Sequence, residues 1–286
     1  MSASYTDQHW TSPDGLKLYY RDYAGPADKP PVLCLHGLTR NSRDFAPLAE
    51  TLAGDWRVIV PEMRGRGKSE YAKDTGTYAP PVYIKDVEAL LESLGVEKFV
   101  AIGTSMGGLM TMLMAAKDAS RIVAAVLNDI GPEIDEEGLE RIAGYVGHGR
   151  SFDTWMHAAS SLQDTHGDSF PDYTIDTWLE MAKRTMVLGQ NGRIALDYDM
   201  GIADPFKSAN AAPQPDLWPA FKALSDTPTL LLRGELSDLL SAQTVSRMEK
   251  EHGDLRTVTV PRIGHAPMLD EPESLAAIHA LLADIA

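Results

Sequence analysis

Short apolar runs recur along this chain, and segments with helical periodicity lie between them. The apolar runs occupy residues 31–35, 57–60, 98–102, 122–127 and 229–232. A short run with apolar side chains at nearly every position is typical of a strand buried on both faces of a sheet. Two other segments, 16–23 and 255–260, alternate apolar and polar residues, which predicts strands with one exposed face. The turn signal PDG at 13–15 pairs the first of these with residues 8–11 in a hairpin.

Helices are predicted between the strands. The segments concerned are 42–52, 81–94, 106–117, 242–252 and 272–285. Strands and helices therefore alternate along the chain, and a crossover helix between two strands allows those strands to run parallel. The sequence predicts an α/β fold, with a mostly parallel, doubly wound sheet of eight strands and helices on both faces.

The alternation stops between residues 131 and 219. This segment contains acidic clusters and many aromatic residues but no buried strand, so we expect a helical cap inserted after the sixth strand. The core then consists of 1–130 and 220–286, and the loop 209–219 returns the chain to it. Pockets beneath a cap are mostly apolar, although a cap must also bury a core of its own. Two cap residues, Trp155 and Trp178, are candidate substrate contacts.

The sequence GTSMG at 103–107 joins the fifth strand to a predicted helix. So sharp a turn crowds the backbone, which accounts for a glycine on each side of Ser105. The serine hydroxyl then points out of the turn, and the N–H groups that begin the helix face the group it attacks. This pattern is a nucleophile elbow, and it makes Ser105 the candidate nucleophile.

A candidate acid and a candidate base follow the last two predicted strands. Functional groups of parallel α/β sheets gather beyond the carboxyl ends of the strands. Glu235 and Asp238 follow the seventh strand, and Asp238 is expected to reach further across the sheet edge. His265 follows the eighth strand in a short loop, after a glycine. A serine needs a base for its proton, and the base needs a carboxylate to fix its tautomer. The order Ser105, Asp238, His265 fits a triad of this architecture.

The third predicted strand ends in His36 and Gly37 at the same edge of the sheet. The loop that follows is placed to offer a backbone N–H to an oxyanion, beside the N–H of Met106. We expect His36 itself to support this loop through hydrogen bonds. Arg64, in a glycine-rich loop, is likewise expected to have a structural role.

Composition narrows the choice of partners. The 286 residues include 26 basic and 41 acidic side chains, a net charge of −15. This charge argues against nucleic acid or an anionic membrane and leaves a small-molecule substrate as the expected partner, with monomer and homodimer both open. No apolar run reaches the roughly 18 residues that span a bilayer. The first ten residues lack the pattern of a signal peptide, so a cytoplasmic protein is expected. The single cysteine, Cys34, allows no internal disulfide and should be buried in its strand.

Five motifs together resemble those of the α/β-hydrolase superfamily. They are LHG at 35–37, PEMRGRGKS at 61–69, GTSMGG at 103–108, RGELSD at 233–238 and GHAP at 264–267. The similarity covers nearly the whole chain, and it is greatest to bacterial carboxylesterases, lactonases and carbon–carbon-bond hydrolases of aromatic degradation. The resemblance implies Ser105 as nucleophile, Asp238 as acid and His265 as base. It implies the backbone N–H groups of Leu38 and Met106 as the oxyanion hole.

Two acidic residues bear on this resemblance. Many relatives have aspartate where this chain has Glu62. Asp129 follows the sixth strand, where some relatives carry the acid of their triad, and it is the second candidate for that role.

A serine at the elbow restricts the chemistry. Haloalkane dehalogenases and epoxide hydrolases need a carboxylate there, so Ser105 excludes them. Acyl transfer through an acyl-serine remains, with no metal and no cofactor, and the expected substrate is a small, partly apolar carboxylic ester or lactone. Cleavage of a carbon–carbon bond in a vinylogous diketone would use the same triad. A ligand-binding protein and a cofactor-free oxygenase are the alternatives outside this class.

Overall fold

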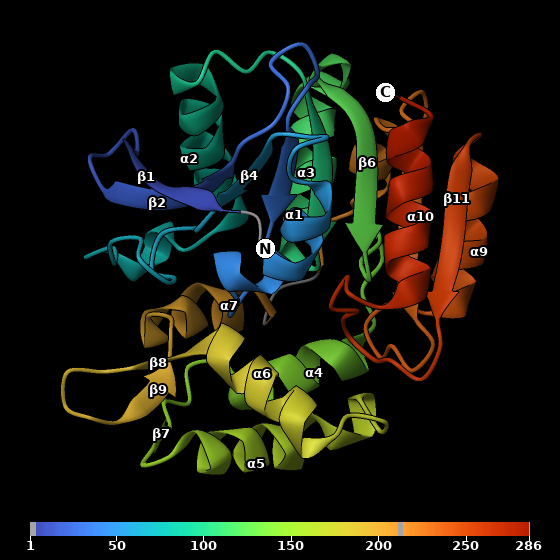
Figure 1. Ribbon diagram of the computed structural model, residues 1–286. Coiled ribbons are helices and arrows are strands. Elements are labelled where there is room, and N and C mark those ends of the chain that lie inside the picture. The colour runs from blue at the N-terminus through green and yellow to red at the C-terminus, as the bar shows by residue number, and fades with distance from the viewer. Residues whose placement is uncertain (1–3, 211–213, 286) are drawn as a thin grey trace.

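A sheet of eight strands forms the centre of the part of the chain that the computed structural model describes, residues 4–210 and 214–285 (Figure 1). Part of the predicted return loop, at 211–213, lies outside that description, as do 1–3 and 286. The strands are β1 (Tyr5–Thr11), β2 (Lys17–Tyr23), β3 (Val32–Leu35), β4 (Val58–Pro61), β5 (Phe99–Thr104), β6 (Ile122–Asn128), β10 (Thr229–Gly234) and β11 (Leu255–Val260).

Their order across the sheet is β1-β2-β4-β3-β5-β6-β10-β11. β1 and β2 form an antiparallel hairpin, and β2 also runs antiparallel to β4. The remaining neighbours pair in parallel. The predicted α/β fold with a mostly parallel sheet is therefore confirmed.

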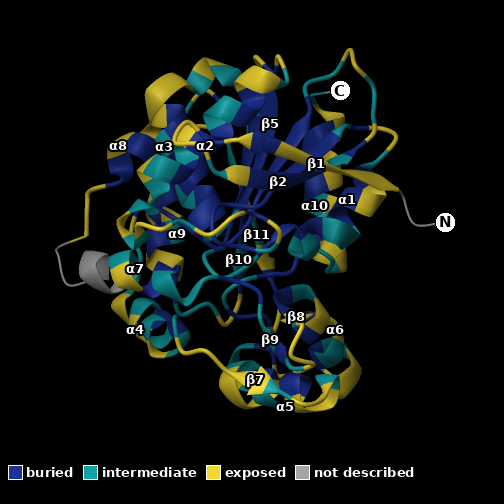
Figure 2. Cartoon of the chain, turned by 90° about the vertical axis from the view of Figure 1, so that its left-hand side faces the viewer, coloured by how far each residue is buried: buried dark blue, intermediate teal, exposed yellow. Residues whose placement is uncertain are grey.

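Helices cover both faces of this sheet, because successive side chains of a buried strand point to opposite faces. On β3, Val32 and Cys34 contribute to one apolar cluster and Leu33 and Leu35 to the other. The first cluster packs against α1 (Ala46–Leu52) and α10 (Pro272–Ala283). The second packs against α2 (Pro80–Ser93), α3 (Met106–Asp118), α8 (Trp218–Lys222) and α9 (Ala242–Glu251). Figure 2 shows the inner strands, such as β5, as the buried centre of the molecule, while β1 at the edge of the sheet is largely exposed.

Between β6 and α8 the chain forms a second layer, which we call the cap. Its helices are α4 (Glu136–Tyr145), α5 (Trp155–His166), α6 (Ile175–Thr185) and α7 (Ala203–Asn210). In Figure 1 it lies beyond the arrowhead of β6, at the carboxyl edge of the parallel strands. The described part of the chain has no helix that is both long and apolar enough to cross a bilayer.

The cap also contains a small sheet that the sequence did not predict. Its strands β7 (Ser151–Phe152), β8 (Met186–Leu188) and β9 (Ile194–Leu196) pair in the order β7-β9-β8. Strands of two or three residues are too short to produce a recognisable alternation. Val187 and Leu188 are exposed, so β8 also lacks the buried character by which the core strands were found.

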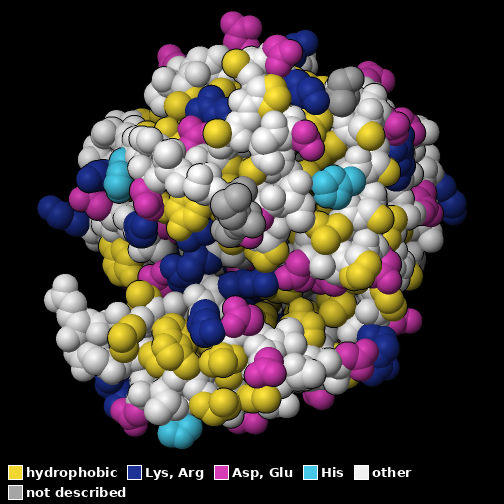
Figure 3. All heavy atoms as spheres, viewed as in Figure 1, with side chains coloured by type: hydrophobic (Ala, Val, Ile, Leu, Met, Phe, Trp, Pro, Cys, Tyr) yellow, Lys and Arg dark blue, Asp and Glu magenta, His cyan; other side chains and the backbone are white. Residues whose placement is uncertain are grey.

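Ion pairs join the cap to the core along the seam between them. They are Arg43–Asp197 at 2.7 Å, Arg184–Asp270 at 2.8 Å, Arg262–Asp172 and Arg141–Asp238. In Figure 3 a furrow marks this seam, with basic and acidic side chains along it. Each pair has one partner in the cap and one in the core, so together they fix the cap over the sheet edge.

Close approach of α3 to the sheet determines the elbow between β5 and α3. A Cβ on Gly107 would lie 1.9 Å from the carbonyl oxygen of Leu35, and one on Gly103 would lie 2.4 Å from the backbone of Gly107. Ser105 sits between them with φ of 51°, a conformation that L residues rarely adopt. The glycines around Ser105 are therefore required by the packing of the helix against β3 and β5.

Replacing Gly107 with alanine should destabilise the fold. The new methyl group would meet backbone atoms of Leu35, which cannot move aside as a side chain can. We expect the free energy of unfolding in urea to fall by about 3 kcal/mol or more. Gly253→Ala is the matched control, since a Cβ there meets nothing within 4 Å, and it should change that free energy by less than about 0.5 kcal/mol. Equal effects of the two substitutions would contradict this account of the elbow.

Candidate active site

Ser105, His265 and Asp129 form a hydrogen-bonded chain. The Ser105 Oγ lies 2.9 Å from His265 Nε2, and His265 Nδ1 lies 2.8 Å from Asp129 Oδ2. An ionised carboxylate only accepts hydrogen bonds, so the proton of the neutral imidazole resides on Nδ1. His265 Nε2 is then free to accept the proton of the Ser105 hydroxyl.

The sheet brings these three residues together. Ser105 lies between β5 and α3, Asp129 directly follows β6, and His265 follows β11. All three therefore lie beyond the carboxyl ends of parallel strands, where sites of α/β sheets form. A Cβ on Gly234 would lie 2.4 Å from the carbonyl oxygen of Ile263, so only glycine lets the end of β10 approach the loop that carries His265.

The Asp129 carboxylate is fully buried and accepts hydrogen bonds from three residues. Besides His265, it accepts from the backbone N–H of Gly234 at 2.8 Å and from the Ser237 hydroxyl at 2.6 Å. These bonds compensate the carboxylate for its loss of water and hold Oδ2 against the imidazole. Asp129 is thus positioned as the partner of His265.

The prediction of Asp238 as that partner is wrong in this structure. Asp238 forms a bidentate ion pair with Arg141 of α4, one of whose bonds measures 2.9 Å, and its backbone carbonyl accepts the N–H of Gly138. Burial alone would raise the pKa of the Asp238 carboxyl, but the hydrogen bonds and charge of Arg141 outweigh it, so that pKa lies below its usual value. Asp238 holds the cap to the core, and the second candidate, Asp129, takes its predicted place beside His265.

The loop after β3 is fixed by buried polar side chains. His36 Nε2 accepts the N–H of Met63 at 3.0 Å, and His36 Nδ1 lies 2.7 Å from the Gly37 carbonyl. The carbonyl of Leu38 accepts a hydrogen bond from Arg66 Nε at 3.0 Å. His36 therefore supports the loop as expected, while the contribution of Arg66 was missed.

The predicted oxyanion donors are Leu38, in the loop after β3, and Met106, which directly follows the nucleophile in the chain. Leu38 lines the same pocket as Ser105. Met106 is the first residue of α3, and the N–H groups of a first helical turn have no acceptor within the helix. The positive end of the α3 dipole adds to the attraction for negative charge at this point.

Glu62 directly follows β4, and its carboxylate is held by hydrogen bonds. Its Oε1 accepts the Ser42 hydroxyl at 2.6 Å, and its Oε2 accepts the N–H of Lys68 at 2.6 Å. A Cβ on Gly67 would lie 2.1 Å from Glu62, so the glycine makes room for this side chain. Arg64 has the structural role expected of it, because it is buried in ion pairs with Asp86 and Asp14.

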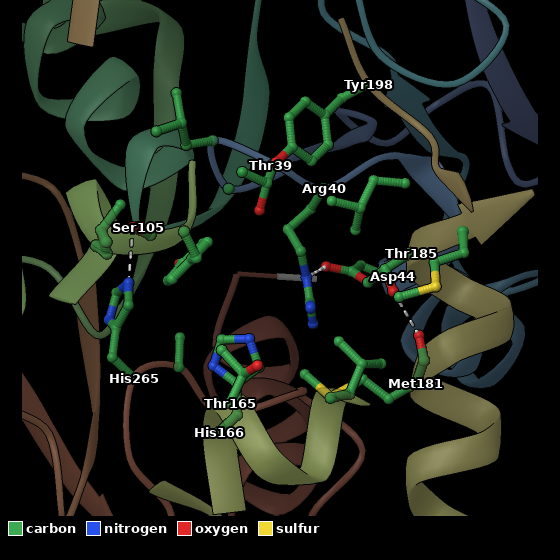
Figure 4. Close-up of a pocket in the computed structure, with 18 of the residues that line it drawn as sticks. Thr39, Arg40, Asp44, Ser105, Thr165, His166, Met181, Thr185, Tyr198 and His265 are labelled. Carbon is green, nitrogen blue, oxygen red and sulfur yellow. Dashed lines mark hydrogen bonds and ion pairs between the residues drawn. The ribbon is translucent and has the colours of Figure 1, made fainter. Parts of the chain in front are cut away.

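A cavity of about 160 Å³ lies between the sheet edge and the cap and contains Ser105 and His265 (Figure 4). Apolar side chains such as Phe45, Phe170 and Leu196 line part of it. Its polar lining includes Arg40, Asp44, Tyr145, Thr165, His166, Thr185 and Tyr198. Burial, with nearby Arg40 and Arg141, lowers the pKa of His166 to about 4, so its imidazole is neutral at neutral pH.

Neither predicted tryptophan contact reaches this cavity. Trp178 is 1% exposed and packs within the cap against the rings of Phe170 and Tyr173. Trp155 packs against the same cluster. Both predictions are wrong because these aromatic residues bury the core of the cap.

Comparison with known proteins decides the family. A model of the alpha/beta hydrolase fold matches residues 30–272. The chain belongs to this family. A 3-hydroxybutyrate-oligomer hydrolase from Cupriavidus necator is 38% identical over 273 residues, which cover 93% of this chain and 92% of that protein. A 2-(acetamidomethylene)succinate hydrolase from Mesorhizobium japonicum is 27% identical, with 82% and 81% covered.

A solved structure has the same fold over nearly all of this α/β hydrolase. It is the crystal structure of an alpha/beta hydrolase from Novosphingobium aromaticivorans, with a TM-score of 0.95, 62% identity and 99% of each chain covered. These relatives are named as hydrolases, and the prediction that this chain is a hydrolase is confirmed at that level.

Substituting Asp129 and Asp238 separately should show which acid serves His265. Asp129→Asn keeps the shape of the side chain but favours the wrong imidazole tautomer, and in serine hydrolases such a change lowers kcat by about 10⁴-fold. Asp238→Asn should change kcat less than about ten-fold, since Asp238 contacts Arg141 instead. Steady-state kinetics on a p-nitrophenyl ester measures both. A larger loss of kcat in the Asp238 variant would contradict the assignment.

His36 should make the stability of the protein sensitive to acid. Burial lowers the pKa of His36 to about 3, whereas a histidine in an unfolded chain has a pKa near about 6.5. Between these values the unfolded state binds a proton that the folded state does not, so stability falls as pH decreases. His36 contributes at most about 1.4 kcal/mol per pH unit to this slope. His36→Gln, measured by urea unfolding from pH 7.5 to 4.5, should show a shallower decline than wild type, and parallel curves would contradict the prediction.

Proposed function

We propose that this α/β hydrolase cleaves a small carboxylic ester or lactone through an acyl-serine intermediate. The observation that carries the proposal is the chain of hydrogen bonds from Ser105 through His265 to Asp129. It opens into a small cavity beneath the cap, which suits a small-molecule substrate. We propose no nucleic-acid or membrane partner.

In this mechanism His265 moves the proton in both half-reactions. As the Ser105 Oγ attacks the scissile carbonyl carbon, His265 Nε2 takes the hydroxyl proton, and the N–H groups of Leu38 and Met106 bind the oxyanion. His265 then gives that proton to the leaving alkoxide, and the alcohol departs as the acyl-serine forms. Water attacks the acyl carbon, with its proton passing to His265 Nε2. His265 then returns that proton to the Ser105 Oγ as the acid is released. Asp129 stabilises the imidazolium in both steps.

The relatives favour an ester among the substrates that this arrangement can cleave. The relative from Cupriavidus necator, at 38% identity, is named for hydrolysis of 3-hydroxybutyrate oligomers, whose units are joined by ester bonds. We therefore propose short esters of hydroxy acids as the first substrates to test. Nothing in the described residues specifically favours carbon–carbon bond cleavage.

Replacement of Ser105 with alanine should abolish ester hydrolysis. The variant retains the cavity and the oxyanion donors but lacks the nucleophile, so kcat for p-nitrophenyl butyrate should fall by at least about 10³-fold. A fluorophosphonate probe should label wild type and fail to label the variant, as detected by intact-protein mass spectrometry.

Thr104→Ser is the control for damage to the elbow, because it alters the residue beside the nucleophile and keeps a hydroxyl for Asn128 Nδ2, which lies 3.0 Å from the Thr104 Oγ1. It should retain labelling by the probe. Equal rates of hydrolysis by wild type and Ser105→Ala would refute the mechanism, as would tight ligand binding by wild type without any turnover.

A further inference from the structure

Arg40 places a cation inside the cavity that contains the nucleophile. It lies in the loop after β3, and in Figure 4 its guanidinium occupies the middle of the pocket, between Ser105 and His265 on one side and Thr185 on the other. Its side chain is only 19% exposed. The triad and oxyanion donors described above make no use of this charge.

The Arg40 guanidinium has N–H donors that the contacts described for it do not use. Its Nε donates to Asp44, and the described partner of its Nη2 is the thioether sulfur of Met268 at 3.0 Å. A thioether is a weak acceptor, whereas a guanidinium carries five N–H donors in a planar fork that matches a carboxylate. Asp44 therefore orients Arg40 from one side and leaves the Nη edge for a stronger acceptor than sulfur.

The charge of the pocket favours an anion. The protein as a whole carries −15, yet among the described residues the cavity is lined by two arginines, Arg40 and Arg150, and by a single carboxylate, Asp44. That carboxylate is already paired with Arg40. The lining therefore has the opposite sign to the rest of the molecule.

Arg40 also lies close to the nucleophile. The Arg40 Cγ is 3.4 Å and the Ser105 Cβ 3.8 Å from the point where a Cβ on Gly37 would sit. Arg40 and Ser105 thus both adjoin Gly37, and the guanidinium of Arg40 extends away from Ser105 into the cavity. A group bound at the guanidinium and a carbonyl held at Ser105 would therefore lie in the same cavity.

We infer that Arg40 is a specificity residue that binds a free carboxylate carried by the ester, so that the preferred substrates are short esters bearing a carboxylic acid. This inference rests on the proposed ester hydrolysis and names the class of ester. A charge-assisted, two-point hydrogen bond inside the cavity beneath the cap distinguishes the acid from its neutral ester, because the neutral ester lacks the anionic oxygens.

The test compares an acid with its own methyl ester. The substrates are the linear dimer of 3-hydroxybutyrate with a free carboxylate and the methyl ester of that dimer, and the quantity measured is the ratio of their kcat/KM values. Wild type should prefer the acid by about ten-fold or more, since a hydrogen bond to a charged group contributes about 1.5–3 kcal/mol. Arg40→Met should lower this ratio at least about ten-fold, mainly through KM for the acid.

Two further variants separate recognition from packing. Arg40→Lys keeps the positive charge and should retain part of the preference for the acid. Arg150→Met removes the other lining arginine, whose Nη1 lies 3.2 Å from the Ser161 hydroxyl, and should keep the ratio of wild type within about two-fold. An equal loss of preference in Arg150→Met would show that the general field of the pocket, and no specific contact of Arg40, recognises the anion.

A measurement on wild type alone guards against misfolding of the variants. Wild type should hydrolyse monomethyl succinate, whose free carboxylate is not the group under attack, with a kcat/KM at least about ten-fold higher than that for dimethyl succinate. Equal kcat/KM values for the two esters would overturn the inference, as would an Arg40→Met variant that loses activity equally on the acid and on its methyl ester. Absence of hydrolysis of every ester by wild type would instead refute the proposed function itself.

Discussion

One buried carboxylate links three separate segments at the catalytic edge of this hydrolase. Asp129 directly follows β6 and accepts hydrogen bonds from Gly234 at the end of β10, from Ser237 in the loop after it and from His265 after β11. A buried charge is tolerated only where such donors surround it, so the positions of these segments depend on one another. The imidazole is thereby held against Ser105 by packing and hydrogen bonds that exist before any substrate arrives.

Much of this arrangement follows from local sequence, because local sterics dictate it. The apolar runs identify the core strands, and the glycines on each side of Ser105 identify the elbow, since backbone contacts with Leu35 forbid a Cβ at Gly107. The choice between Asp129 and Asp238 does not follow locally. Both residues follow strands that end at the same edge of the sheet. Their roles differ because Asp238 forms an ion pair with Arg141 of the cap.

The residues that line the pocket could not be predicted from local sequence patterns either. Tryptophans in the cap suggest an apolar site, yet Trp178 is buried in the apolar core of the cap itself. The pocket that contains the nucleophile is instead lined by residues such as Arg40 from the core and His166 from the cap. Only the fold shows that a chain with a large negative charge has the cation of Arg40 in this pocket. The cap therefore determines specificity through the polar groups it encloses as well as through its shape.

Placing the acid after β6 has a mechanical consequence for the loop after β10. Ser237 donates to Asp129, and its neighbour in the chain, Asp238, is paired with Arg141 of the cap. A single peptide bond thus separates Asp238, which anchors the cap, from Ser237, which donates a hydrogen bond to Asp129. Any tilt of α4 away from the sheet pulls on the residue next to that donor. A displacement of the cap would consequently reach the hydrogen bonds of Asp129 through a short covalent link.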